Sequence, residues 1–183
     1  MHAAADASLD AFITRSLDQA LSEGPESMAV ATADAAHGDV DDRIRQVLAA
    51  IREHAGMDVV FVSKFVDGTR YFQFVDAVTA SLASALLGRA DPLEQSWCFQ
   101  IAHGRMPEVI ADATPLIASG AAPRTDLEIR THLSAPIVLR GGHIYGTVCC
   151  FSSSTKSQQA LERDIHRLRA VAEILARRIR RAG

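Results

Sequence analysis

Residues 132–151, HLSAPIVLRGGHIYGTVCCF, decide how this chain folds. Two apolar runs flank Gly141-Gly142. Paired glycines between β-prone segments are typical of a hairpin, because glycine reaches the positive φ angles of tight turns without steric cost. We therefore expect the two runs to be antiparallel neighbouring strands in the centre of a sheet.

Length and composition limit what surrounds this hairpin. The chain has 183 residues, of which 48% are hydrophobic and 22% are charged. That is enough for one substantial core, so a single domain with helical extensions is the simplest interpretation. The formal net charge is -3, which gives no overall basic field of the kind that draws proteins to nucleic acid. We expect no nucleic-acid partner.

Membrane insertion and secretion are not indicated either. No apolar run approaches the roughly 18 residues that span a bilayer, and the opening residues MHAAADASLD lack a basic segment followed by an apolar one. The three cysteines are an odd number, and two of them are sequence neighbours, so they do not form a disulfide framework. We expect a cytoplasmic protein with reduced thiols and no membrane partner.

The first half of the chain predicts two helices and a hairpin. An apolar stripe between Leu9 and Leu21 predicts a first helix that ends at Gly24-Pro25, and residues 26–39 read as a linker. A second helix opens in the charged run 39–45 and ends at Gly56. DVVFVSKFV and TRYFQFVDAV then flank Asp67-Gly68, which is again a hairpin signature.

The second half contributes a helix, a short strand, a loop and a long helix around the central hairpin. Residues 79–90 show no clear period, and Asp91-Pro92 looks like the start of a helix, with Asp91 as N-cap, that runs to Gly104. Residues 107–110 predict a short strand, and residues 112–124 predict a lid-like loop with one helical turn.

The last helix, from about residue 157 to 181, carries a heptad-like apolar seam. We expect one side of this helix to pack on the sheet and the seam to continue into a partner helix, which predicts a homodimer. The seam residues are Leu161, Ile165, Leu168, Ala172, Leu175 and Ile179.

Two segments of this pattern resemble a known family. SWCFQIAHGRMPEVIADAT (96–114) is similar to a helix, short strand and Asp-containing loop of bacterial GAF domains, and SAPIVLRGGHIYGTVCCF (134–151) is similar to their final hairpin. The resemblance covers residues 39–179 and divides the chain into an N-terminal helix and linker, 1–38, and a GAF domain, 39–183. It implies an α/β (α+β) fold with a GAF/PAS-like antiparallel sheet of about five or six strands.

The same resemblance implies where a ligand would bind. In GAF domains the terminal helices cover one face of the sheet, and the ligand lies on the other face, under the pocket helix and lid. Because side chains alternate along a strand, only one parity of each strand can face that pocket. The expected ligand-binding residues are Phe61, Ser63, Trp97, Cys98, Ile101, Asp112, Thr114, Leu133, Ala135, Thr147 and Cys149.

The cysteines are interpreted as structural, because free cysteine often behaves as a small buried hydrophobe. Cys149 and Cys150 are adjacent on a strand and so point to opposite faces. GAF-type reductases of free methionine sulfoxide gather several cysteines on their pocket. This sequence lacks that spacing and can bring at most Cys98 and Cys149 together.

The sequence does not identify a cofactor. GAF domains that carry a bilin usually attach it at a cysteine followed by histidine, whereas Cys98 is followed by Phe99. His103 and His132 are candidate haem ligands, although lone histidines are more often structural. The Asn-Lys-Phe-Asp-Glu signature of cyclic-nucleotide binding is missing, and the near-match at residues 63–67 lies on the first strand and turn.

No catalytic signature is present either, whether a phosphate-binding glycine loop, a GxSxG elbow, a zinc-spaced cluster or a Ser/His/Asp set. We therefore expect no enzyme but a small-molecule-sensing regulatory module that couples an unidentified ligand to its terminal helices. In related proteins such a helix leads to an output domain, such as a histidine kinase or diguanylate cyclase, or the module acts by association. The alternative is a constitutive dimerisation scaffold without ligand, and less favoured alternatives are haem, bilin or methionine-sulfoxide-reductase types.

Overall fold

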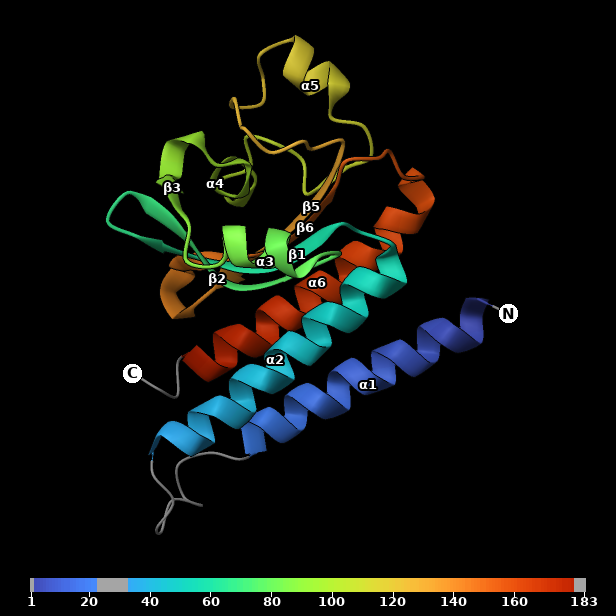
Figure 1. Ribbon diagram of the computed structural model, residues 1–183, viewed down its shortest axis with the longest axis vertical. Coiled ribbons are helices and arrows are strands. Elements are labelled where there is room, and N and C mark those ends of the chain that lie inside the picture. The colour runs from blue at the N-terminus through green and yellow to red at the C-terminus, as the bar shows by residue number, and fades with distance from the viewer. Residues whose placement is uncertain (1, 23–32, 180–183) are drawn as a thin grey trace.

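The computed structural model describes residues 2–22 and 33–179. They form one six-stranded antiparallel sheet with helices on both faces (Figure 1). The strand order is β3-β2-β1-β6-β5-β4. This mixed α/β architecture confirms the predicted fold class.

The strands are β1 (Val59–Val66), β2 (Thr69–Ala77), β3 (Ala90–Pro92), β4 (Val109–Ile110), β5 (Thr131–Val138) and β6 (Ile144–Ser152). The α-helices are α1 (His2–Ser22), α2 (Ala33–Ala55), α3 (Ala80–Leu86), α4 (Trp97–Ala102), α5 (Thr114–Ala118) and α6 (Gln158–Ile179). Two 3₁₀ turns, η2 (Leu93–Gln95) and η3 (Arg140–Gly142), complete the chain.

Both predicted hairpins are present, and their turns use the backbone angles that glycine permits. The β1–β2 turn has positive φ at Asp67 (47°) and Gly68 (74°), as a two-residue hairpin turn of type I′ requires. The β5–β6 turn has φ of 79° at Gly141 and 82° at Gly142. There the Leu139 N–H donates to the His143 carbonyl at 2.8 Å and closes the turn.

β1 and β6 are the central pair of the sheet, and their backbones meet closely at Gly146. A Cβ at this position would lie 1.9 Å from the carbonyl oxygen of Ser63 on β1. Gly146 pairs with Lys64, one step from the Ser63–Thr147 pair. Glycine is therefore required here by contact with the neighbouring backbone.

Helix α1 packs on the outer side of α2 and α6, which run side by side along one face of the sheet (Figure 1). Their apolar stripes pack on side chains from alternate strand positions, such as Val60, Val148 and Cys150. The seam of α6 is occupied inside the chain, because Leu161, Leu168 and the other seam residues up to Leu175 are buried in this core. A partner helix is therefore not needed to bury these seam residues.

The opposite face of the sheet is covered by the short helices and loops between β2 and β5. Its core is rich in aromatic and sulfur side chains, and Phe61, Trp97, Cys98 and Cys149 are each at most 3% exposed. The rings of Phe61 and Phe72 lie 4.6 Å apart between centroids. This aromatic layer is the floor of the candidate site.

Two local predictions were wrong, and one short helix was not predicted. Helix α2 begins at Ala33 and not at residue 39 as predicted, because the alanine-rich stretch favours helix. The rest of the predicted linker, residues 26–32, lies outside the described residues. The segment from Thr79 contains α3, capped by the Thr79 side chain, which accepts from the Leu82 N–H. No helix begins at Asp91, because residues 90–92 pair with β2 as β3, and α4 begins after Ser96, whose side chain accepts from the Phe99 N–H.

No helix within residues 2–22 and 33–179 is long and apolar enough to cross a lipid bilayer.

The close approach at Gly146 predicts a large loss of stability for Gly146→Ala. The added methyl group would meet the Ser63 carbonyl, so β1 and β6 would have to separate, and we expect a loss of at least about 3 kcal/mol in the free energy of unfolding. Gly120→Ala is the matched control, because its Cβ meets nothing within 4 Å and it incurs only left-handed strain of about 1 kcal/mol. If urea titrations gave the same loss of unfolding free energy for Gly146→Ala and Gly120→Ala, the close contact of β1 and β6 at Gly146 would be contradicted.

Candidate functional site

Most of the predicted ligand-binding residues lie together on the face of the sheet away from the terminal helices. On β1 and β6, Phe61 pairs with Cys149 and Ser63 pairs with Thr147, so the four side chains share that face. The Ser63 and Thr147 hydroxyls are 2.7 Å apart. Trp97, Cys98 and Ile101 of α4 pack against the same face.

The orientation predicted for β5 was wrong. Leu133 and Ala135 lie in the core beneath the terminal helices, fully buried, and so do not face the pocket. Leu133 pairs with Cys150, and directly opposed residues of an antiparallel pair point to the same side. His132 and Ser134 therefore take the pocket-facing positions, and sequence analysis did not place either of them there.

The lid residues were also misplaced. Asp112 and Thr114 are exposed and serve the start of α5, where the Asp112 carboxylate accepts from the Thr114 N–H at 2.9 Å and from its hydroxyl at 2.6 Å. Arg130 Nη1 donates to the same hydroxyl at 2.8 Å. Helix α5 stands away from the sheet (Figure 1), and the bonds between Asp112 and Thr114 lie at its start, so they stabilise the lid.

A small chamber lies over the aromatic floor and holds only about 20 Å³. One water-sized molecule fits in such a volume. Half of the lining residues are apolar and half are polar or charged. They are Phe61, Arg70, Gln95, Ser96, Trp97, Thr125, Leu127, Ile129, His132 and Phe151.

A wider hollow of about 280 Å³ adjoins this chamber and forms its mouth. Arg70, Gln95 and Thr125 line both spaces, so they connect. Three guanidinium groups and two carboxylates converge on the mouth. Its lining is Arg70, Arg89, Asp91, Gln95, Arg124, Thr125 and Asp126.

Arg70 links the mouth, the chamber and the thiols. The residue is 7% exposed, forms an ion pair with Asp91, and lies over the Phe72 ring with its guanidinium carbon 4.4 Å from the centroid. Its Nη1 is 3.5 Å from Cys98 Sγ. Burial alone lowers the pKa of Arg70, but the nearby Cys98 and Asp91 outweigh burial and raise it, so the group stays charged.

Two buried nitrogens in this region have no hydrogen-bond partner among the described residues. They are Arg70 Nε and His132 Nδ1. His132 is 1% exposed, and its ring lies beside that of Trp97, with centroids 5.7 Å apart. Buried polar atoms are normally satisfied, so two unsatisfied ones on residues that line one chamber indicate that a polar group is missing there.

A thiol pair lies directly behind this chamber. Cys98 and Cys149 are fully buried, and their sulfur atoms are 3.2 Å apart. Ser134 Oγ is 3.1 Å and Thr147 Oγ1 is 2.9 Å from Cys149 Sγ. The predicted meeting of Cys98 with Cys149 is thus present, and Cys150 packs on the opposite face of the sheet.

The surroundings make the two thiols unequal. Burial raises the pKa of Cys98, but hydrogen bonds from Cys149 and His132 and the charge of Arg70 together hold it well below the usual value. Burial and the neighbouring Cys98 raise the pKa of Cys149 well above it. Of the two thiols, Cys98 has the lower pKa, so these surroundings favour a thiolate at Cys98 over one at Cys149.

Cys98, His132 and Cys149 also have the ligand types of a metal site. One ligand atom from each lies within 4.8 Å of the others, and thiolate with imidazole is a set that zinc accepts. The Arg70 guanidinium, 3.5 Å from Cys98 Sγ, opposes a cation at this position. The structure does not bring the two candidate haem ligands together, because His103 is exposed and hydrogen-bonds its own helix at the Phe99 carbonyl.

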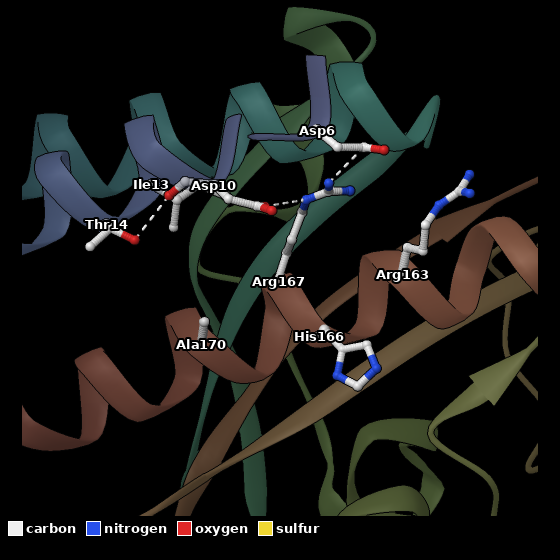
Figure 2. A pocket seen from close by; sticks show the side chains of 8 residues that line it. All are labelled: Asp6, Asp10, Ile13, Thr14, Arg163, His166, Arg167 and Ala170. Atoms are coloured by element: carbon white, nitrogen blue, oxygen red, sulfur yellow. Dashed lines mark hydrogen bonds and ion pairs between the residues drawn. The ribbon is translucent and has the colours of Figure 1, made fainter. Parts of the chain in front are cut away.

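A second hollow, of about 400 Å³, lies on the far side of the molecule between α1 and α6 (Figure 2). Arg167 of α6 points into it and pairs with Asp6 and Asp10 of α1, at 2.7 and 2.8 Å, and with Asp164 of its own helix at 2.9 Å. Its guanidinium is thus fully engaged in holding the two helices together. We interpret this groove as helix packing and not as a ligand site.

The arginines of the mouth were missed at the sequence level, although one signal was present. Arg70 and Phe72 are two residues apart on β2, so they share a face, and Phe72 is a core residue. Arg89 and Arg124 come from loops, where no period applies. Asp91 was interpreted as a helix cap, whereas its carboxylate binds Arg70 and Arg89.

Comparison with solved structures shows a shared fold at low sequence identity. The nlh2 GAF domain of A. aeolicus in an inactive state is 12% identical, with a TM-score of 0.61 over 96% of this chain and 99% of that chain. The phycoerythrobilin-bound GAF domain of a cyanobacterial phytochrome is 17% identical, with 0.60 over 96% and 95%. Free methionine-R-sulfoxide reductase of Neisseria meningitidis, solved with its substrate, is 18% identical, with 0.56 over 77% and 78%.

Sequence identities this low establish only that the fold is shared. No curated protein sequence matches this chain. A sequence model of the GAF domain family, whose members are sensor and regulatory modules, matches residues 39–179. That match covers most of the chain, including the sheet and α6. The chain therefore belongs to the GAF domain family.

Proposed function

We propose that this chain is a small-molecule-sensing regulatory module whose ligand is a compact anion bound at the arginine-lined mouth. One observation carries the proposal: Arg70 Nε and His132 Nδ1, on two residues that line the chamber, are buried and have no hydrogen-bond partner in the described part of the chain. A carboxylate or phosphate oxygen entering from the mouth accepts from Arg70 Nε–H, and it accepts from His132 Nδ1 when that nitrogen carries a proton.

The size and charge of the mouth limit the ligand. Its volume of about 280 Å³ is at the lower end of the range for small-molecule pockets, so the ligand has few heavy atoms. Three guanidinium groups outnumber the two carboxylates there. Arg89 bridges Asp91 and Asp126, whereas Arg124 forms no ion pair with any described residue. Arg124 is thus the charge left to receive an anion.

The route to the output runs through the sheet. The chamber wall includes Phe61 on β1, and its strand neighbours Val60 and Val62 pack under the terminal helices. If the sheet and its helices have two arrangements, a ligand shifts the equilibrium between them only when it binds one arrangement more tightly than the other. The size of the shift is set by that difference in affinity. We propose that α6 reports that shift to an output domain or partner kinase or cyclase, in a cytoplasmic homodimer, without catalysis.

A constitutive scaffold remains the second candidate, and one observation favours it. The chamber holds only about 20 Å³, because Phe61, Trp97 and Phe151 fill most of the space over the sheet. A module whose pocket is occupied by its own side chains would associate through its helices without a ligand. The anion experiment below separates the two candidates.

Compact anions should stabilise the protein by binding the folded state. In thermal unfolding with inorganic phosphate and a panel of short mono- and dicarboxylates, we expect at least one to raise Tm in a saturable manner, because binding to the native state alone shifts the folding equilibrium. Arg124→Gln should weaken that binding by about tenfold, since one charge-assisted hydrogen bond is lost.

Arg140→Gln is the matched control, because Arg140 is an exposed arginine in the β5–β6 turn, outside the mouth lining. It should leave the midpoint of anion binding unchanged. A full panel without any shift in a folded protein favours the scaffold. Equal weakening in both variants would mean general charge screening and not a site.

Asp91 should be far more important for stability than its neighbour Asp126. Asp91→Asn removes the charge that compensates the buried Arg70, and we expect a loss of about 2–3 kcal/mol in the free energy of unfolding. Asp126→Asn is the control, because that carboxylate is 68% exposed and its one ion pair among the described residues is with Arg89, so a loss of about 0.5 kcal/mol is expected. If urea titrations gave similar losses of unfolding free energy for Asp91→Asn and Asp126→Asn, the buried Arg70–Asp91 pair would not be what stabilises the mouth.

A further inference from the structure

The pair Cys98–Cys149 has no role in anion binding at the mouth, yet its geometry is close to that of a disulfide. Cys98 lies on α4 and Cys149 on β6, so the two sulfurs come from different elements across the pocket face. They are 3.2 Å apart, whereas a disulfide needs about 2.05 Å. A movement of about 1 Å would join them.

The two sulfurs differ in the way that a reactive and a resolving thiol differ. The guanidinium of Arg70, 3.5 Å from Cys98 Sγ, stabilises a thiolate there, and the thiolate is the form that attacks an electrophile. The Cys149 thiol donates to Cys98 Sγ and lies within 3.1 Å of the Ser134 hydroxyl. Cys149 is thus held protonated beside the reactive sulfur.

Cys98 does not itself line the chamber, so only a very small molecule could approach it from there. Cys98 is 0% exposed, but Arg70, Trp97 and His132, which surround it, also wall the 20 Å³ chamber. That space holds about one water molecule and opens toward the mouth through Arg70. Hydrogen peroxide is the oxidant closest to water in size, whereas bulkier hydroperoxides and glutathione disulfide exceed the chamber.

We propose that Cys98 is an oxidation site for hydrogen peroxide and that Cys149 resolves the product into an intramolecular disulfide. The Cys98 thiolate attacks one peroxide oxygen, the O–O bond breaks, and the departing hydroxide takes up a proton to form water. Cys149 then attacks the sulfenic sulfur of Cys98, the S–O bond breaks, and the hydroxyl leaves as water with the Cys149 proton. Two thiols are oxidised, and one peroxide is reduced to two waters.

This site is distinct from the anion site, because its reacting atoms are the two sulfurs behind the chamber. The two sites share Arg70, which lines the mouth and lies 3.5 Å from Cys98 Sγ. Cys150 takes no part. It is packed on the opposite face of the sheet, and burial and Asp164 raise the pKa of its thiol. A disulfide would tie α4 to β6 and thereby fix the pocket helix on the central strand pair.

The test uses the reduced full chain and hydrogen peroxide. Intact mass after treatment should show the loss of two hydrogens, and thiol titration in denaturant should fall from three groups to one, with recovery in dithiothreitol. Peptide mapping should place the bond between Cys98 and Cys149. tert-Butyl hydroperoxide should react at least about tenfold more slowly, because it does not fit the chamber.

Three single variants separate the roles. Cys149→Ser should stop at a sulfenic acid on Cys98 that dimedone traps, and Cys98→Ser should give neither sulfenic acid nor disulfide. Cys150→Ser is the matched control, another buried cysteine whose loss should leave disulfide formation unchanged. Circular dichroism establishes that each variant is folded.

The wild-type protein alone can overturn the proposal. Three titratable thiols after excess peroxide, or a disulfide that includes Cys150, would contradict it. One equivalent of zinc in the purified protein, with Cys98 and Cys149 protected until the metal is chelated, would contradict it in favour of a metal site. Equal rates with tert-butyl hydroperoxide would contradict entry through the chamber.

Discussion

The buried ion pair between Arg70 and Asp91 is the interaction on which the candidate site depends. Arg70 lies on β2 and Asp91 on β3, so their pairing fastens the edge strand to the sheet beside the mouth. A guanidinium at 7% exposure would be unfavourable without a compensating charge, and with Asp91 it can be held next to Cys98 and the chamber. Arg70 thereby has three roles. Its charge lies at the mouth, its Nε is an unsatisfied donor at the chamber, and its guanidinium stabilises a thiolate at Cys98.

The sheet around this pair follows from short-range signals. Asp67-Gly68 and Gly141-Gly142 specify their turns through positive φ, and a tight turn between two β-prone runs is enough to predict antiparallel pairing. The family resemblance then placed terminal helices and pocket on opposite faces. Parity was predicted correctly for Phe61, Ser63, Thr147 and Cys149, and this brought Cys98 close to Cys149 as the one cysteine pair that could meet.

The errors arise where tertiary contacts override local pattern. Leu133 and Ala135 were assigned to the pocket, because a continuous apolar strand gives no indication of which parity faces which layer, and only the register with Cys150 settles it. His132 and Ser134 therefore went unrecognised on the pocket face. Arg89 and Arg124 reach the mouth from loops, and Asp91 looked like a helix cap until its partner on β2 was known.

The central claim is that a polar group occupies the space between Arg70 Nε and His132 Nδ1. A high-resolution crystal structure of protein purified without added ligands tests it most directly. The account predicts electron density for a ligand or water atom within hydrogen-bonding distance of both nitrogens. Density-free space between them, with His132 turned so that both of its nitrogens bond to protein atoms, would contradict it.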